Sequence, residues 1–146
     1  MARIRAAKWI PVVTLLATAS CGGDSPTEPE APEAFLGCAD VRSHSIGSTT
    51  IGTLSSGSCL YVNDPTDLYE FRLSQSRTVT IVLNSSAFDA WLFLFDRTTG
   101  VVIAFDDDSG GGFNSRIQQN LAAGTYVIGA TSFDGGTGAY TMSTSQ

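Results

Sequence analysis

The chain has 146 residues, of which 42% are hydrophobic and 15% charged. This length suits one globular domain with an accessory segment and excludes a second core. The net charge of −6 makes nucleic acid and anionic lipid poor partners and favours cations or basic proteins.

The first 20 residues have the pattern of an export signal. An apolar run from Trp9 to Ala19 ends in small residues before Cys21. The run is well short of the roughly 20 residues that cross a bilayer, so we expect a cleaved signal peptide over residues 1–20. The basic residues that precede the run are Arg3, Arg5 and Lys8.

The segment Thr18-Ala19-Ser20-Cys21 resembles the lipobox of bacterial lipoproteins. This resemblance implies that Cys21 carries lipid after cleavage and that the lipid is the only contact with a membrane. Gly22 stands where an aspartate is associated with retention at the inner membrane, which implies an outer-membrane or cell-surface location. The alternative is an ordinary secretory cleavage near the same point, which would leave Cys21 as a free thiol.

Residues 21–33 are rich in proline, glycine and acids and lack apolar periodicity. This composition predicts an extended linker that holds a domain away from the lipid surface. Removal of residues 1–20 leaves five arginines and all 14 acids, so the mature chain has a net charge of −9.

Two further cysteines, Cys38 and Cys59, form an even pair if Cys21 is lipidated. In an oxidising compartment we expect a disulfide between them, which would tie the N-terminal arm to the domain. Metal binding by these two cysteines and His44 is the alternative, but the cysteines lack the close paired spacing of zinc sites.

Residues 34–146 show short apolar segments separated by Gly, Asp and Ser, with no helical periodicity. We expect an all-β domain, an antiparallel β-sandwich with jelly-roll-like or Greek-key connections. A turn over Asn63–Asp67 should precede one strand. The expected strands are Thr49–Leu54, Leu68–Leu73, Thr78–Leu83, Ala90–Phe95, Val101–Phe105, Arg116–Leu121, Thr125–Thr131 and Ala139–Ser143.

A series of motifs along residues 34–146 resembles the bacterial pre-peptidase C-terminal domain. The resemblance implies a non-catalytic β-sandwich, usually appended to secreted proteases and other exported enzymes and linked to secretion, localisation or substrate attachment. Related collagen-binding modules bind calcium. The motifs are Asp67-Leu68-Tyr69-Glu70-Phe71, Val79-Thr80-Ile81, Phe88-Asp89-Ala90-Trp91-Leu92, residues 103–110, Asn114-Ser115-Arg116-Ile117, residues 121–126 and Gly138-Ala139-Tyr140-Thr141.

Catalytic motifs are missing from the expected mature chain. It has one histidine, His44, and it contains neither Gly-x-Ser-x-Gly nor His-Glu-x-x-His. The glycine run 110–112 lacks the lysine of a phosphate-binding loop. We therefore expect a protein that is not an enzyme and that requires no cofactor.

Calcium binding is a more specific hypothesis than catalysis for this sequence. Calcium takes six to eight oxygen ligands, and the chain has three consecutive acids close to three consecutive glycines. Asp106, Asp107, Asp108, Ser109 and Asn114 could supply oxygens from this one loop, with Asp134 or Asp67 reaching in from another. In the alternative, one aspartate pairs with Arg116, one caps backbone N–H groups of the glycine turn and one is solvated.

The aromatic residues Trp91, Phe93 and Phe95 alternate with Leu92 and Leu94. If the leucines point inward, the aromatic residues form an exposed stripe that could bind sugar rings or a polypeptide. The alternative, which we favour, is a central strand buried on both faces.

Together these features predict an exported, lipid-anchored module that binds or localises in the cell envelope. Its partner would be an envelope or extracellular protein or a polysaccharide. The alternative is a secretion or stability accessory domain for exported proteins.

Overall fold

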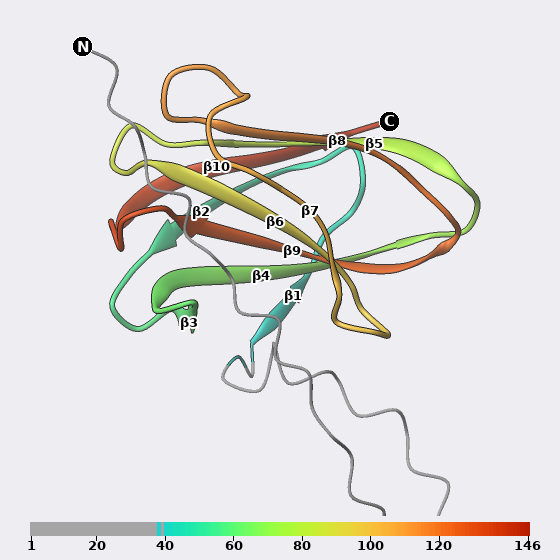
Figure 1. Cartoon of the computed structure of the whole chain (residues 1–146), viewed down its shortest axis with the longest axis horizontal. Helices are drawn as coiled ribbons and strands as arrows, with labels where there is room; N and C mark the ends of the chain where they lie inside the picture. Colours follow the sequence, from blue (N-terminus) through green and yellow to red (C-terminus); the bar gives the residue numbers. More distant parts are fainter. Residues whose placement is uncertain (1–37, 39) are drawn as a thin grey trace, which may run out of the picture.

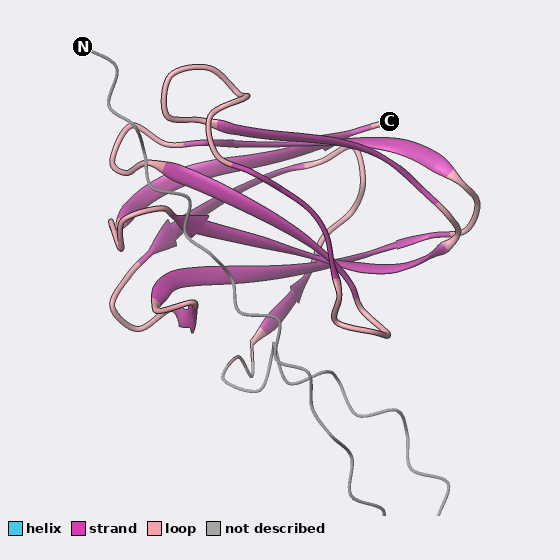
Figure 2. Cartoon of the chain, in the orientation of Figure 1, coloured by secondary structure: helices cyan, strands magenta, loops and turns pink. Residues whose placement is uncertain are grey.

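A computed structural model describes Cys38 and residues 40–146. This part of the chain contains ten β-strands and no helix (Figures 1 and 2). The residues described thus include no helix with the length and apolarity needed to cross a bilayer. The predictions for the signal peptide (1–20), Cys21, the linker (21–33) and residues 34–37 lie outside the described residues.

The strands form two sheets that pack face to face, as Figure 1 shows, and the expected antiparallel β-sandwich is confirmed. Neighbouring strands are antiparallel, apart from β1 and β4, which are parallel. The first sheet has the order β1 (Val41–Ser43), β4 (Asp64–Leu73), β9 (Gly124–Ser132), β6 (Ala90–Asp96) and β7 (Val102–Asp106), and β3 (Cys59–Tyr61) also pairs with β4. The second sheet has the order β2 (Thr49–Leu54), β10 (Gly138–Ser145), β5 (Arg77–Asn84) and β8 (Ser115–Leu121).

All eight expected strands are present, but the turn expected over Asn63–Asp67 is wrong. The strand β4 begins at Asp64, and the turn consists of Val62 and Asn63, whose φ angles are 53° and 71°. Two residues with positive φ form the tight hairpin that joins β3 to β4. The proline at position 65 is tolerated because β4 pairs with β9 only from Thr66 onward.

The main core lies between the two sheets and follows the period-two pattern of the strands. Side chains of the first sheet meet side chains of the second sheet there, and burial of each large one stabilises the fold by about 1.5–3 kcal/mol. The core residues expected from the alternation are Tyr69, Phe71 and Leu73 on β4 and Val79, Ile81 and Leu83 on β5, and all six are buried.

A second apolar cluster lies on the other face of the first sheet. Trp91, Phe93 and Phe95 are buried in this cluster, whereas Leu92 and Leu94 belong to the main core. The ring of Tyr61 contacts the rings of Phe93 and Phe95, with centroid distances of 4.8 and 5.3 Å. The interpretation of the aromatic residues as an exposed stripe is therefore wrong, because β6 is covered on both faces.

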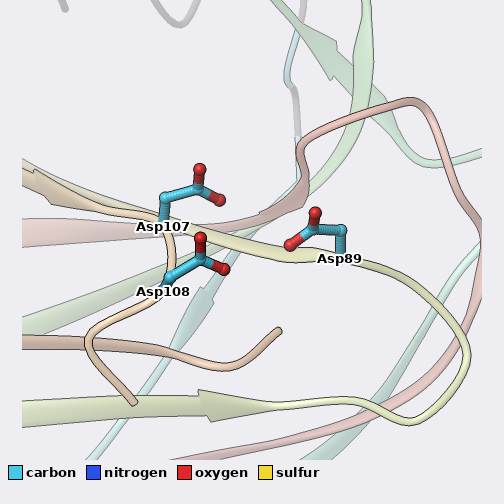
Figure 3. A group of neighbouring side chains, drawn as sticks. All are labelled: Asp89, Asp107 and Asp108. Atoms are coloured by element: carbon cyan, nitrogen blue, oxygen red, sulfur yellow. The ribbon is translucent and has the colours of Figure 1, made fainter. Parts of the chain in front are cut away.

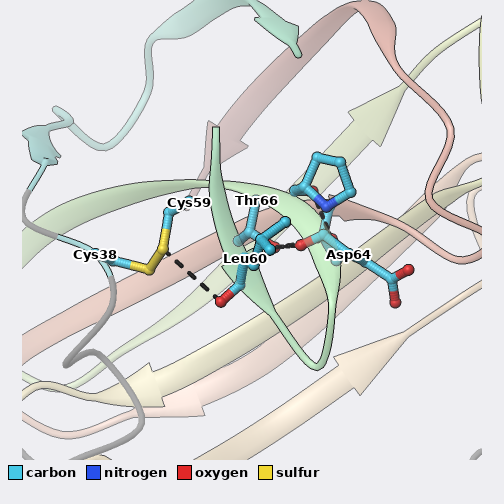
Figure 4. Close-up of a disulfide and its surroundings, with 7 residues drawn as sticks. Cys38, Cys59, Leu60, Asp64 and Thr66 are labelled. Carbon is cyan, nitrogen blue, oxygen red and sulfur yellow. Dashed lines mark hydrogen bonds between the residues drawn. A yellow bond between two sulfur atoms is a disulfide. The ribbon is translucent and has the colours of Figure 1, made fainter. Parts of the chain in front are cut away.

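Cys38 and Cys59 form the expected disulfide (Figure 4). The bond joins the segment that precedes β1 to β3, and both of these strands pair with β4. It therefore ties two short strands, each with few ladder hydrogen bonds, to one edge of the first sheet.

Candidate functional site

Three loops meet at one end of the sandwich: β5–β6 (residues 85–89), β7–β8 (residues 107–114) and β9–β10 (residues 133–137). Backbone hydrogen bonds join them, from Ala90 N–H to the Phe113 carbonyl and from Phe133 N–H to the Asp89 carbonyl, both at 2.9 Å. Carboxylates gather at this end. They belong to Asp89, Asp107, Asp108 and Asp134 in the loops and to Asp64 at the start of β4.

Asp106, the last residue of β7, fixes the acidic turn. Its Oδ2 accepts the backbone N–H of Ser109 at 3.0 Å and that of Arg116 at 2.7 Å, and the Ser109 hydroxyl donates to its Oδ1. Because Arg116 lies on β8, this carboxylate also links the two sheets. Asp106 thus caps backbone N–H groups, and Arg116 contributes its N–H to the contact.

Asp107 and Asp108 point toward Asp89 (Figure 3). One carboxylate oxygen from each of the three residues lies within 4.8 Å of the others. Asp89 and Asp107 are half-buried and Asp108 is exposed. A set of converging carboxylate oxygens suits a hard cation such as calcium.

The side chains of two other expected calcium ligands, Asn114 and Asp134, make hydrogen bonds within the loops. Asn114 Oδ1 accepts the N–H of Ser85 at 3.0 Å, and its Nδ2 donates to the Gly111 carbonyl at 3.0 Å. Asp134 Oδ1 accepts the N–H of Gly136 at 3.3 Å. The structure therefore brings together only Asp107 and Asp108 of the expected set and adds Asp89.

The glycine run gives the β7–β8 loop its shape. Gly111 and Gly112 have φ angles of 95° and 67°, which favour glycine. A Cβ atom on Gly110 would lie 2.7 Å from the backbone of Asn114. These glycines let the loop fold back on itself, with Gly110 N–H donating to the Asn114 carbonyl at 2.9 Å.

Asp67, considered as a second-loop calcium ligand, lies instead in a buried network between the sheets. Its Oδ2 accepts the hydroxyl of Tyr140 at 2.6 Å and Nη1 of Arg42 at 3.3 Å. The hydroxyls of Tyr69 and Tyr140 are 2.6 Å apart. Burial and then the hydrogen bonds to Asp67 and Tyr69 raise the pKa of Tyr140 well above its ordinary value. Burial acts to lower the pKa of Arg42, but Asp67 and the hydrogen bond to Tyr69 outweigh it and leave that pKa raised.

His44 has a structural role, because its ring is buried beside two strands of the second sheet. Its Nδ1 lies 3.1 Å from the Thr50 hydroxyl and its Nε2 lies 2.8 Å from the Thr144 hydroxyl, so it joins β2 to β10. Burial lowers the pKa of His44, which favours the neutral ring. With the cysteines joined in a disulfide, the alternative metal site of Cys38, Cys59 and His44 is wrong.

These strands and loops match a known family. Residues 65–132 match the family model of the bacterial pre-peptidase C-terminal domain. The matched region runs from β4 to β9 and includes Asp89, Asp107 and Asp108. The family resemblance found in the sequence is thereby confirmed over this region.

Two solved structures have a fold similar to that of this chain. The chain is similar to the pre-peptidase C-terminal domain of collagenase from Bacillus anthracis, with 20% identity and a TM-score of 0.60 over 72% of this chain and 94% of that one. It is also similar to PliG from Aeromonas hydrophila, a periplasmic inhibitor of g-type lysozyme, with 15% identity and a TM-score of 0.52 over 71% and 95%. None of the curated proteins compared with the chain matches it.

The residue that sequence reasoning missed as a candidate ligand is Asp89. The positions of the aspartates relative to the strands could have indicated Asp89, because β6 and β7 form an antiparallel pair in which Leu92 faces Asp106. That register places the residues just before β6 opposite those just after β7. An aspartate immediately before one strand and two immediately after its partner therefore predict a shared site.

Proposed function

We propose that the protein is a non-catalytic, lipid-anchored module that binds or localises in the cell envelope. The observation that carries this proposal is the match of residues 65–132 to the pre-peptidase C-terminal domain, a kind of accessory domain found on secreted peptidases. The Cys38–Cys59 disulfide supports export, because such bonds persist in oxidising compartments. The alternative is a secretion or stability accessory role for exported proteins.

A non-catalytic role is supported by the use that the described residues make of their titratable groups. His44 is buried between two threonine hydroxyls. Asp67 binds Arg42 and Tyr140 inside the sandwich, and Asp106 caps the acidic turn. In this part of the chain these groups serve as structural links, and His44 and Asp67 lie in the interior.

Lipid attachment at Cys21 is the part of the proposal that fixes location. Fractionation of bacteria that express the full chain should place the wild type in the membrane fraction. Cys21→Ala should move it to the soluble envelope or the medium, whereas Ser20→Ala, which keeps a small residue before the cysteine, should not. Equal release of the wild type and of Cys21→Ala would contradict lipid anchoring.

We further propose that Asp89, Asp107 and Asp108 bind calcium and stabilise the acidic end. Their carboxylates converge from two loops, and a divalent cation would relieve the repulsion between like charges. Backbone carbonyls and water would complete the six to eight oxygens that calcium takes.

Thermal unfolding of the full chain in millimolar calcium and in chelator tests this site. Calcium should raise the midpoint of the wild type, and Asp107→Asn should abolish the increase. Asp40→Asn serves as the matched control, because the side chain of Asp40 is 80% exposed and lies outside the cluster. A wild-type midpoint that neither calcium nor chelator changes would exclude the site.

A further inference from the structure

Charge is distributed unevenly between the two sheets. The four strands of the second sheet contain no aspartate or glutamate, and their charged residues are Arg77 and Arg116. Every described carboxylate side chain belongs to the first sheet or to the loops. The strands of the second sheet thus present an outer face without acids, on which Arg116 of β8 is the charged residue that alternates outward.

This outer face is rich in hydroxyl and amide groups. It is identified by alternation, because Tyr140 and Met142 on β10 and Leu83 on β5 point into the core. The outward side chains include Thr49, Ile51 and Thr53 on β2, Thr141 and Ser143 on β10, Thr80, Val82 and Asn84 on β5, and Arg116, Gln118 and Asn120 on β8.

An open groove of about 490 Å³ crosses one end of this face. Strand register places Ile51, Thr141 and Asn84 in one row across β2, β10 and β5. Since strands lie about 4.8 Å apart, the row is roughly 10 Å long. Ser85, Ser86 and Asn114 extend the groove beyond it.

The floor of the groove is held in place before any ligand arrives. The Ser85 hydroxyl donates to the Ala139 carbonyl at 2.9 Å, and Ser85 N–H donates to Asn114 Oδ1 at 3.0 Å. The walls carry the exposed side chains of Asn84, Ser86 and Thr141. A rigid floor lowers the entropy cost of binding.

We propose that this groove binds an uncharged polysaccharide chain laid across β2, β10 and β5. The amide of Asn84 and the hydroxyl of Thr141 can each donate and accept hydrogen bonds, as sugar hydroxyls do. Ile51, which is 81% exposed, offers an apolar contact for the C–H face of a sugar ring. This inference rests on the proposed binding function and names its ligand class.

The lining of the groove argues against ionic and purely apolar ligands. The residues that line the groove include no acid and no base, so an ionic ligand would find no partner. An anionic polysaccharide would also approach Asp107 and Asp108, since Asn114 closes their loop. A purely apolar ligand would strip water from Asn84, Ser86 and Thr141 without replacing their hydrogen bonds.

The test is a titration of the full chain with hexasaccharides of β-1,4-glucose, α-1,4-glucose, β-1,4-xylose and β-1,4-N-acetylglucosamine, followed by amide NMR shifts. At least one should shift the amides of Asn84, Ser86 and Thr141. The double variant Asn84→Ala, Thr141→Ala should weaken that binding about tenfold or more. The matched control is Thr78→Ala, Asn120→Ala, an exposed pair in another row of the same face, which should leave it unchanged.

Three results would overturn the inference: no shifts with any of the four hexasaccharides, shifts that the double variant leaves unaltered, or tighter binding of hexagalacturonate, which is anionic. The membrane fractionation of Cys21→Ala is read separately. If the wild type binds no glycan but stays in the membrane fraction through Cys21, only the proposed polysaccharide ligand is refuted. If the wild type is released from the membrane fraction, the proposed lipid-anchored module is refuted instead.

Discussion

The Tyr140 hydroxyl should contribute more to stability than an ordinary tyrosine hydrogen bond. It donates to Asp67 Oδ2 at 2.6 Å and lies 2.6 Å from the Tyr69 hydroxyl. The side chain of Asp67 is only 4% exposed. In Tyr140→Phe this buried carboxylate loses its shortest donor and retains Arg42 Nη1 at 3.3 Å.

The expected cost follows from these contacts. A hydrogen bond to a charged group contributes about 1.5–3 kcal/mol, and the contact with Tyr69 adds about 1 kcal/mol. Arg42 can offset part of this loss, because its side chain is 47% exposed and free to adjust. We therefore expect Tyr140→Phe to lower the free energy of unfolding by about 3 kcal/mol and the Tm by roughly 10–15 °C.

Chemical denaturation at neutral pH measures this cost, and Tyr126→Phe is the matched control. The Tyr126 hydroxyl donates to the neutral Ala122 carbonyl at 2.9 Å, so its removal should cost only about 1 kcal/mol. A double-mutant cycle with Asp67→Asn should give a coupling energy of about 2 kcal/mol. Equal costs for the two tyrosines, or no coupling with Asp67, would refute the assignment of a charge-assisted bond.

Three other changes test the packing, the histidine and the disulfide. Gly52→Ala should lower the free energy of unfolding by about 2 kcal/mol or more in denaturant titrations, because the added Cβ would lie 2.2 Å from Cζ of Tyr140. Gly57→Ala is the control: its Cβ would have only Ser55 within 4 Å, so it should be nearly neutral. Burial lowers the pKa of His44 below 6.5, so the unfolded chain takes up a proton at this residue more readily than the folded chain. The free energy of unfolding should therefore keep the full contribution of His44 above pH 6.5 and lose it as the pH falls through the folded-state pKa. In His44→Gln this pH dependence of the unfolding free energy should be weaker. Reduction of the Cys38–Cys59 bond should cost about 3 kcal/mol, and a double alanine variant should no longer respond to reductant.

The strands could be predicted from the sequence because their burial is periodic. The side chains of β4 that face the core are those of Tyr69, Phe71 and Leu73. In the sequence they alternate with polar residues, and this period-two pattern is what indicates a strand with one buried face. The short strands β1 and β3 could not be predicted, since three residues carry too little pattern. Their position depends on pairing with β4 and on the disulfide, which are contacts across the fold.

The buried network could not be predicted either. Arg42, Asp67 and Tyr140 lie far apart in the sequence and on three different strands. Only the packing of the two sheets brings the hydroxyl of Tyr140 to the carboxylate of Asp67. Local composition therefore suggested a loop ligand where the structure has an internal link between the sheets.

The three consecutive aspartates show why adjacency in sequence does not imply a shared site. Asp106 is the last residue of β7 and faces Leu92 of β6, a residue of the main core, so its carboxylate turns toward the second sheet and accepts Arg116 N–H. The chain then leaves the strand, and the next two carboxylates turn toward Asp89. Asp106 holds the corner that positions Asp107 and Asp108. If these residues bind calcium as proposed, Asp106→Asn should reduce the calcium-dependent rise in the unfolding midpoint by loosening the loop, even though the three proposed ligands remain.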